Sequence, residues 1–244
     1  MRIIVITLLP EMFNALMDYG VLSRIFSAQK VSLEFINPRD FVSDVHKTID
    51  DRPFGGGPGM LMLAEPLAKS IELAKQKCPQ APVIYLSPQG EVFDQRRAEE
   101  LSKNLIENSL NTHAGLIFIC GRYEGIDQRV LDCLVDREIS LGDFVLTGGE
   151  LALMCILDAV LRLIPGVLGD SESALQDSFS NSEGLLDCPH YTRPLIWRGL
   201  SVPEILLSGH HEKIKKWRHE KALEITEIKR PDIFKKFLEK IKNK

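Results

Sequence analysis

Residues 116–125 read LIFICGRYEG and place a short apolar run directly before a loop bracketed by Gly121 and Gly125. An unbroken apolar run of this length, rich in Ile and containing Phe, is typical of a strand buried on both faces. Such strands form parallel sheets, in which the loops after the strands lie at the carboxyl edge where ligands bind. This stretch therefore predicts an α/β fold with a ligand cavity beside the loop.

The same pattern recurs on either side of this stretch. Short strand-like runs rich in Val, Ile and Phe occupy residues 3–9, 31–36 and 83–86. Amphipathic segments typical of helices occupy residues 11–29, 63–77, 93–105, 126–135 and 150–163, and a further strand is predicted at residues 139–146. Strands that alternate with helices indicate a parallel sheet.

A polar, Ser-rich segment divides the chain. Residues 169–183 read GDSESALQDSFSNSE, a composition typical of a linker or mobile loop. We therefore expect a first domain at residues 1–168 and a second at residues 184–244. Within the second, residues 202–208, 211–228 and 231–242 are predicted helices. The interpretation is a parallel α/β domain followed by a small helical domain.

The composition leads us to expect a folded protein that stays in the cytoplasm. Hydrophobic residues make up 44% of the 244 and charged residues 26%, which is enough apolar material for a core. No stretch approaches the ~20 apolar residues of a membrane span, and the N-terminal sequence shows no signal-peptide cleavage site. The five cysteines are scattered and never form C-x-x-C. We expect reduced thiols and no zinc, although Cys188, His190, His210 and His211 carry side chains that can bind metals.

Basic residues concentrate near the C-terminus. Residues 204–244 contain 12 Lys and Arg against 7 Asp and Glu, a net charge of +5. The whole chain carries −4, so the remainder carries −9. A basic, helix-rich end on an acidic body suggests a segment that binds a polyanion, and a solvated charged helix is the alternative. Charge alone does not separate the two.

Glycine-rich loops carry the main functional signal, because glycine lets main-chain groups approach a ligand closely. They are FGGGPGM at 54–60, SPQG at 87–90, CGRYEG at 120–125 and LGDFVLTGGE at 141–150. The sequence lacks the loop motifs of P-loop NTPases, dinucleotide dehydrogenases and α/β-hydrolases, which argues against those classes. The remaining pattern suits a nucleoside held by main-chain groups against apolar walls. The alternative is that each glycine serves only a turn.

The loops and their surroundings resemble one family along most of the chain. The strings DDRPFGGGPGM (50–60), SPQG (87–90), CGRYEGIDQRV (120–130), LGDFVLTGGELA (141–152), LIPGVLGD (163–170), DSFS (177–180) and PHYTRP (189–194) are similar, in order, to those of bacterial tRNA (guanine-N1)-methyltransferases. The similarity extends from residue 1 to about residue 211. Departures are mild: Leu141 and Phe144 replace the commoner Ile and Tyr, and residues 104–113 look like an insertion.

The resemblance implies a knotted (trefoil) α/β methyltransferase domain with S-adenosylmethionine bent within the knot, and a homodimer with composite active sites. It places thirteen residues around the methyl donor: Leu86, Ser87, Pro88, Gly121, Glu124, Leu141, Gly142, Asp143, Phe144, Val145, Leu146, Gly148 and Gly149. It also implies tRNA as the partner, held along its backbone by the basic C-terminal region. Mg²⁺ is implied as well, although the sequence shows no ligand motif for it.

Two catalytic residues follow from the resemblance, Asp177 in DSFS and Arg162 in LRLIPG. Guanine N1 carries a proton in neutral water, and a carboxylate such as Asp177 can accept that proton during attack on the methyl group. Negative charge then builds on O6, which a guanidinium such as Arg162 stabilises. Composition alone gives simpler interpretations: an acid in a solvated linker, and a basic residue favoured by a helix C-terminus.

Two other functions stay open at this stage. A related knotted methyltransferase acting on ribose 2′-hydroxyls or ribosomal RNA would share the donor pocket but not the DSFS and PHYTRP strings. A nucleotide-binding RNA adaptor would bind without catalysis. The resemblance itself implies methylation at N1 of the guanine just 3′ of the tRNA anticodon, so formation of 1-methylguanosine separates the three.

Overall fold

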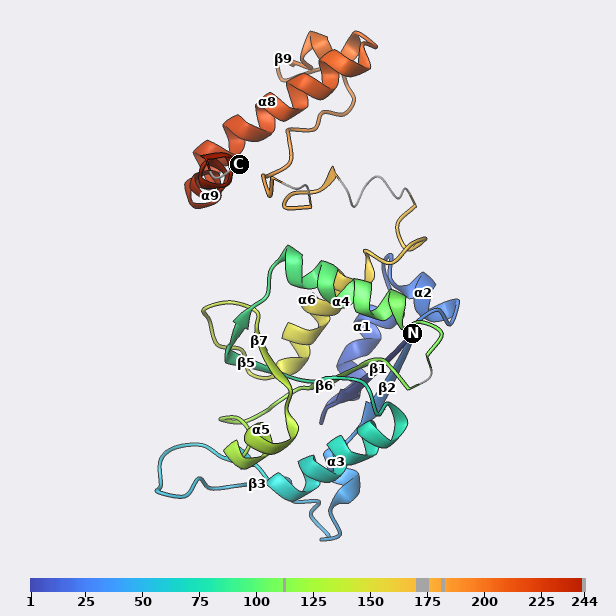
Figure 1. Cartoon of the computed structure of the whole chain (residues 1–244), viewed down its shortest axis with the longest axis vertical. Helices are drawn as coiled ribbons and strands as arrows, with labels where there is room; N and C mark the ends of the chain where they lie inside the picture. The colour runs from blue at the N-terminus through green and yellow to red at the C-terminus, as the bar shows by residue number, and fades with distance from the viewer. Residues whose placement is uncertain (112, 170–175, 181–182, 243–244) are drawn as a thin grey trace. The chain divides into compact units, whose positions relative to one another are not determined.

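The computed structural model describes residues 1–111, 113–169, 176–180 and 183–242. The chain divides into two compact units, Met1–Gly169 and Asp170–Lys244 (Figure 1). Residues 170–175 and 181–182 of the expected linker lie outside the described residues. No helix of the described part of the chain is long and apolar enough to cross a membrane.

The first unit is built on a five-stranded parallel sheet with the order β2-β1-β6-β5-β7. The strands are β1 (Arg2–Ile6), β2 (Ser32–Ile36), β5 (Val83–Val92), β6 (Leu116–Ile119) and β7 (Arg137–Ser140). The parallel α/β sheet predicted from the apolar runs is confirmed. A short antiparallel pair, β3 (Asp50–Asp51) and β4 (Leu61–Met62), brackets the glycine loop at 54–60 and was not predicted.

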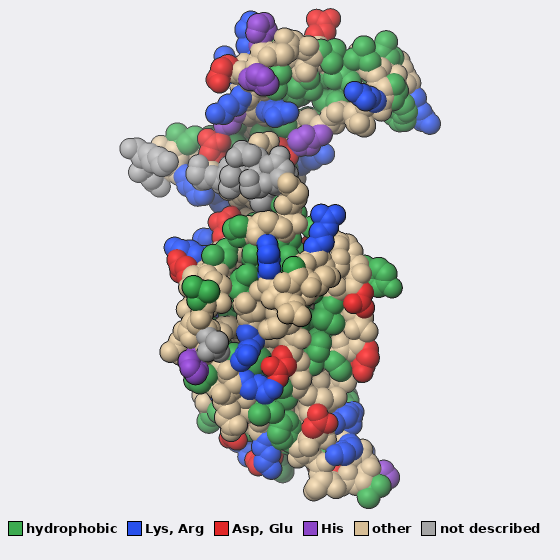
Figure 2. All heavy atoms as spheres, turned by 90° about the vertical axis from the view of Figure 1, so that its right-hand side faces the viewer, with side chains coloured by type: hydrophobic (Ala, Val, Ile, Leu, Met, Phe, Trp, Pro, Cys, Tyr) green, Lys and Arg blue, Asp and Glu red, His purple; other side chains and the backbone are tan. Residues whose placement is uncertain are grey.

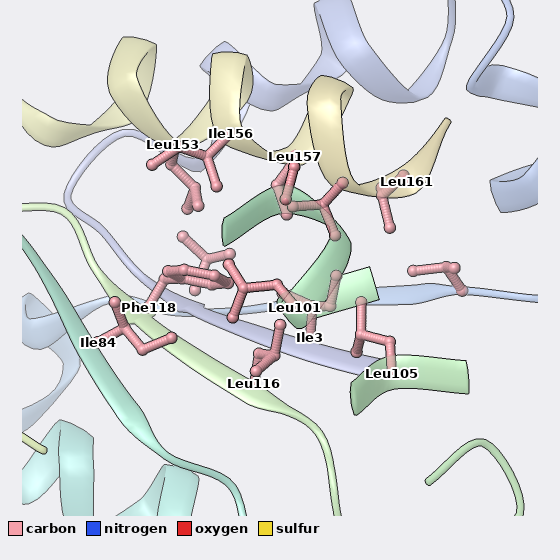
Figure 3. Packing of buried hydrophobic residues seen from close by; sticks show 14 of the residues in the cluster. Ile3, Ile84, Leu101, Leu105, Leu116, Phe118, Leu153, Ile156, Leu157 and Leu161 are labelled. Atoms are coloured by element: carbon pink, nitrogen blue, oxygen red, sulfur yellow. The ribbon is translucent and has the colours of Figure 1, made fainter. Parts of the chain in front are cut away.

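Helices cover both faces of the sheet, because its central strands are apolar on both sides. Ile3 and Phe118 belong to one buried cluster, whereas Ile4 and Ile117 belong to the other. The first cluster contains residues of α4 (Gln95–Glu107) and α6 (Gly149–Leu161), and the second contains residues of α3 (Ala64–Lys77) and α5 (Gln128–Leu134). Figure 3 shows Leu153 and Leu157 of α6 facing the strand residues of the first cluster. Each fully buried side chain of this size contributes about 1.5–3 kcal/mol.

The prediction of a single helix at residues 11–29 is wrong. The chain instead forms η1 (Pro10–Phe13), α1 (Asn14–Met17) and α2 (Ser23–Ser27). Gly20 has φ of +72°, a left-handed conformation that an α-helix does not accommodate. The apolar side chains of the segment still reach the core, because Phe13 and Ile25 are buried.

The strand expected at residues 139–146 is also too long. It ends at Ser140, and residues 141–148 form a loop before α6. Gly142 has φ of +156°, and its N–H donates to Ser140 Oγ (3.2 Å). These local contacts turn the chain away from the sheet and leave Phe144 and Val145 exposed.

The second unit combines a small hairpin with two helices. The hairpin consists of β8 (Ile196–Trp197) and β9 (Leu200–Ser201), and is followed by the 3-10 turn η3 (Glu204–Leu207), which replaces the helix expected at 202–208. The helices are α8 (His211–Lys229) and α9 (Pro231–Lys242). Buried Thr226 of α8 accepts a hydrogen bond from Leu186 N (3.0 Å), which ties the chain after the DSFS string to this helix.

Candidate active site

Three glycine loops meet at the carboxyl edge of the first sheet, because they leave neighbouring parallel strands. One is the detour at Ser87–Gly90 within β5, where the register with β7 shifts between Leu86 and Glu91. The others follow β6 and β7. The α/β rule that ligands bind at this edge therefore applies to this domain.

The loops enclose one cavity. It is lined by Tyr85, Leu86, Ser87, Pro88, Gly121, Arg122, Tyr123, Glu124, Gly125, Ile139, Ser140, Leu141, Gly142, Phe144, Val145, Leu146, Gly148, Gly149 and Ala152. All the residues expected around the methyl donor line this cavity except Asp143, which is exposed. We call it the donor cavity.

Two glycines of the donor cavity leave no room for a side chain. A Cβ on Gly149 would lie 2.8 Å from Cys120 Cα, and Gly149 N donates to Gly121 O (3.0 Å). A Cβ on Gly121 would lie 2.7 Å from the Tyr85 hydroxyl. The start of α6 and the loop after β6 therefore cross at backbone contact distance beside the cavity.

Tyr85 presents a protonated hydroxyl beside this crossing. Burial, followed by the charges of Glu138 and Cys120, raises its pKa to about 12. Its hydroxyl consequently remains neutral at physiological pH and can donate a hydrogen bond. Tyr85 was not predicted as a site residue, because it lies within the apolar run at 83–86, where the pattern indicates only a buried strand.

A buried ion pair lies beneath the donor cavity. Glu150, in the first turn of α6, is 0% exposed, and its Oε2 lies 2.9 Å from an Arg122 guanidinium nitrogen. Thr7 Oγ1 donates to the other Glu150 oxygen (2.7 Å) and accepts from Leu9 N (3.0 Å). Arg122 also donates to Thr147 O (3.3 Å). The network joins the end of β1, the loop after β6 and the loop before α6.

Tyr123 stands at the edge of the donor cavity in a strained conformation. Its φ is +61°, which is rare for a bulky residue and costs of order 1–3 kcal/mol. Partial burial and then a hydrogen bond to the Asp50 side chain raise the pKa of its hydroxyl, whereas Arg39 acts in the opposite direction. Strain of this kind is found where a side chain is held for a function.

The loop at 54–60 contacts the loop after β6. Glu124 N donates to Met60 O (2.9 Å), and Met62 forms an isolated parallel bridge with Ile126. Within the loop, Phe54 is fully exposed. The strings DDRPFGGGPGM and CGRYEG, which are far apart in sequence, are therefore neighbours in space.

The two expected catalytic residues do not line the donor cavity. Arg162 caps the C-terminal end of α6, whereas Gly149 at the cavity begins it. The 13 residues of this helix separate the two ends by about 20 Å, given a rise of about 1.5 Å per residue. Asp177 belongs to the second unit, where its main-chain oxygen accepts from Ser180 N (3.2 Å).

One group of potential metal ligands occurs among the described residues. Asp187, Cys188 and His190 place one ligand atom each within 4.8 Å of one another. His190 Nε2 and Asp187 Oδ2 already lie 2.7 Å apart, and burial, followed by the charge of Asp187, raises the pKa of the Cys188 thiol. The Asp187 carboxylate and the His190 imidazole thus pair with each other, and the Cys188 thiol stays in its neutral form.

This fold and cavity define a class: an α/β protein whose glycine loops form a ligand-sized cavity at the carboxyl edge of a parallel sheet. A sequence model of the family described as "tRNA (Guanine-1)-methyltransferase TrmD" matches residues 1–236. The chain belongs to this family, as its motifs predicted.

Individual relatives agree with this assignment. The chain is 52% identical over 241 residues to a tRNA (guanine-N(1)-)-methyltransferase of Janthinobacterium sp. (strain Marseille). The aligned residues cover 97% of this chain and 92% of the relative. The chain is 53% identical over 238 residues to the protein of the same name from Cupriavidus necator, covering 96% and 87%. The Glaesserella parasuis protein of that name is 52% identical over 234 residues, covering 94% and 88%.

Proposed function

We propose that this enzyme transfers the methyl group of S-adenosylmethionine to N1 of a tRNA guanine, the one just 3′ of the anticodon. The match to this family along nearly the whole chain is the observation that supports this reaction. The family match does not favour the alternatives of a ribose or ribosomal RNA methyltransferase or a non-catalytic adaptor. The donor cavity is the single structural observation that supports where the methyl donor binds.

The donor cavity fits an adenosine-type ligand. Leu141, Val145 and Leu146 offer apolar contacts for a purine ring, and the last two are exposed. Gly121 and Gly149 carry no side chain and line the cavity, so a ligand can approach the main chain of these loops closely. When bound there, S-adenosylmethionine supplies a methyl group activated by a positively charged sulfur.

The protein residues then control the acceptor. In our proposal Asp177 accepts the proton that leaves guanine N1, which frees the lone pair for attack on the methyl carbon. Arg162 stabilises the negative charge that builds on O6. Alignment of the two reactants supplies the rest of the rate enhancement.

The position of Arg162 supports the proposal of a homodimer with composite active sites. Arg162 lies at the opposite end of α6 from its own donor cavity, so a second chain is the simplest source of this guanidinium. Leu151, in the first turn of α6, is 45% exposed, and Cys155, four residues later on the same face of the helix, is also exposed. An apolar stripe at this position suits packing against a second copy, with Asp177 of one chain serving the other's cavity.

The trefoil knot is likewise a proposal. The close crossing of Gly149 and Cys120 supports it, because two segments that pass at backbone contact are expected where a chain threads a loop. Knots are rare exceptions to ordinary topology, and no local pattern specifies them.

The second unit is proposed as the tRNA-binding domain. Lys, Arg and His side chains gather on its surface, as the face in Figure 2 shows. Trp197 is 58% exposed, and the Arg198 guanidinium lies 4.7 Å from its ring centre, a pair suited to stacking and phosphate contact. A Mg²⁺ requirement is also proposed; Glu124 is the carboxylate among the described residues that line the donor cavity.

The proposed function is tested by product analysis. Purified protein is incubated with methyl-labelled S-adenosylmethionine and tRNA, and the digested nucleosides are separated. We expect label in 1-methylguanosine, and none with a matched tRNA carrying adenine at the acceptor position. Label in a 2′-O-methylated nucleoside, or no transfer at all, contradicts the proposal.

A further inference from the structure

The DSFS string forms a tight turn that is attached to a buried part of the second unit. Ser180 N donates to Asp177 O (3.2 Å), and Phe179 between them adopts a left-handed conformation with φ of +71°, which is rare for a bulky residue. Phe179 N donates to Leu185 O (2.8 Å), and Leu185 is 0% exposed. The proposed general base Asp177 therefore stands at the start of an anchored turn.

Two consecutive main-chain N–H groups connect this turn to helix α8. Asp187 N donates to Ser178 Oγ (2.9 Å), and Ser178 is the residue that follows the proposed base. Leu186 N donates to Thr226 Oγ1 of α8 (3.0 Å). All four residues belong to the second unit. The side-chain hydroxyls of Ser178 and Thr226 are thus the acceptors through which the turn is connected to the helix.

Thr226 is suited to this role because both functions of its hydroxyl are used. The residue is 0% exposed, and its Oγ1 donates to Ala222 O one turn earlier (2.6 Å) while it accepts from Leu186 N. The bond to Ala222 fixes the direction of the hydroxyl, which leaves its acceptor side for Leu186. Valine has nearly the same shape as threonine, so Thr226→Val removes both hydrogen bonds with little change in volume.

The same helix presents basic side chains to the solvent. Lys213, Lys215, Lys216 and Arg218 are exposed on α8. Side chains of this kind neutralise the phosphates of a nucleic acid backbone. One helix therefore carries both the charges suited to tRNA and the buried hydroxyl that holds the turn of the proposed base.

We propose that Thr226 and Ser178 are positioning residues, which set the place of Asp177 through the main chain of Leu186 and Asp187. The inference rests on the proposed function, since it concerns the base of that reaction. A base must lie within hydrogen-bond reach of the proton that it accepts, and a misplacement of about 1 Å can lower a rate by about 100-fold. Loss of either hydroxyl should therefore slow the chemical step while tRNA and the methyl donor still bind.

The test compares four variants of the full chain. Thr226→Val and Ser178→Ala each remove one hydroxyl, whereas Thr226→Ser keeps the hydroxyl and removes only a methyl group. Ser180→Ala is the matched control, because Ser180 lies in the same string and its Oγ has no hydrogen-bond partner among the described residues. Single-turnover kinetics measure the chemical step, filter binding measures tRNA affinity, and calorimetry measures donor affinity.

In Thr226→Val and Ser178→Ala we expect the single-turnover rate to fall about 10- to 100-fold, less than for loss of Asp177 itself. Affinities for tRNA and for the donor should stay close to those of the wild type. Thr226→Ser should recover most of the rate, and Ser180→Ala should react like the wild type.

A double variant separates positioning from general damage. When Thr226→Val is combined with Asp177→Ala, the rate should equal that of Asp177→Ala alone to within about twofold, because the hydroxyl acts only through that carboxylate. Rate losses that instead multiply show that Thr226 acts on some other part of the enzyme, and they contradict the proposal.

Unchanged single-turnover rates in both Thr226→Val and Ser178→Ala overturn this assignment while wild-type methylation of guanine stands. A fall in tRNA affinity as large as the fall in rate also overturns it, because that result indicates a damaged second unit. Absence of 1-methylguanosine with the wild-type enzyme instead removes the proposed function itself.

Discussion

The two units of the chain bury their side chains to very different extents. In Met1–Gly169 both faces of a sheet are covered, and strand residues such as Ile4 and Phe118 are fully buried. In the described part of the second unit, burial is confined to a few side chains such as Leu185 and Phe237, while Trp197 and Leu200 remain exposed. The first unit is a rigid scaffold suited to a small ligand, whereas the second offers surface that a macromolecular partner can cover.

The sharpest test of this division is Asp177→Ala. The second unit would lose its proposed general base, so methyl transfer should fall about 100- to 10,000-fold. Donor affinity should stay within twofold, because Asp177 does not line the donor cavity. Single-turnover kinetics and calorimetry measure the two quantities, with exposed Asp18→Ala as the control. Unchanged turnover removes Asp177 as the base.

A substitution in the first unit should instead weaken binding of the methyl donor. In Gly149→Ala the new Cβ meets Cys120 Cα at 2.8 Å, so the crossing beside the donor cavity must open. Overpacking of this kind costs about 1–3 kcal/mol, and we expect the donor Kd to rise about tenfold. Gly169→Ala, where a Cβ meets nothing within 4 Å, is the control. Donor affinity equal to wild type in Gly149→Ala would place the donor elsewhere.

A smaller effect should separate tRNA affinity from donor affinity. Lys215 and Lys216 are exposed on α8 of the second unit. Replacing both with Ala should lower the salt slope of tRNA binding by up to about 1.8, since each phosphate contact contributes about 0.9. Filter binding at several salt concentrations measures the slope, and Lys69→Ala with Lys103→Ala in the first unit is the matched control. An equal loss in the control pair shows that the basic second unit has no special role.

The smallest expected effect concerns stability rather than binding. Arg129 holds the pKa of Asp127, which caps α5, at about 2 instead of 3.8. A depressed carboxyl pKa stabilises the folded state above pH 3.8, and this contribution is lost as the pH falls toward 2. Asp127→Asn should therefore lower the Tm slightly at pH 6, and the difference from wild type should shrink as the pH falls toward 2. Thermal melts that differ by the same amount at both pH values would exclude this linkage.

The elements that sequence predicted best are those whose pattern is local. The run at 116–119 is apolar at every position, so its burial on both faces is visible without any partner. The segment at 11–29 has helical spacing, but one left-handed glycine and short local turns break it. The pairs β3–β4 and β8–β9 are two residues per strand, too short for an alternating pattern to appear.

The candidate site divides in the same way. Its glycine loops are recognisable because each is a contiguous string, and the structure gathers them around one cavity. Glu150 and Thr7 escaped prediction because they are 143 residues apart and meet only in the folded chain. Asp143 was expected with its neighbours, but the turn at Gly142 leaves it outside the cavity lining.

A crystal structure of the full chain with S-adenosylmethionine tests most directly whether the methyl donor binds in the donor cavity at the carboxyl edge of the sheet. The predicted result is adenine against Leu141–Leu146 and the ribose beside Gly121, with the methyl group directed toward Tyr123 at the edge of the donor cavity. Donor density at any other place, or a donor cavity closed by the loop before α6, would contradict it.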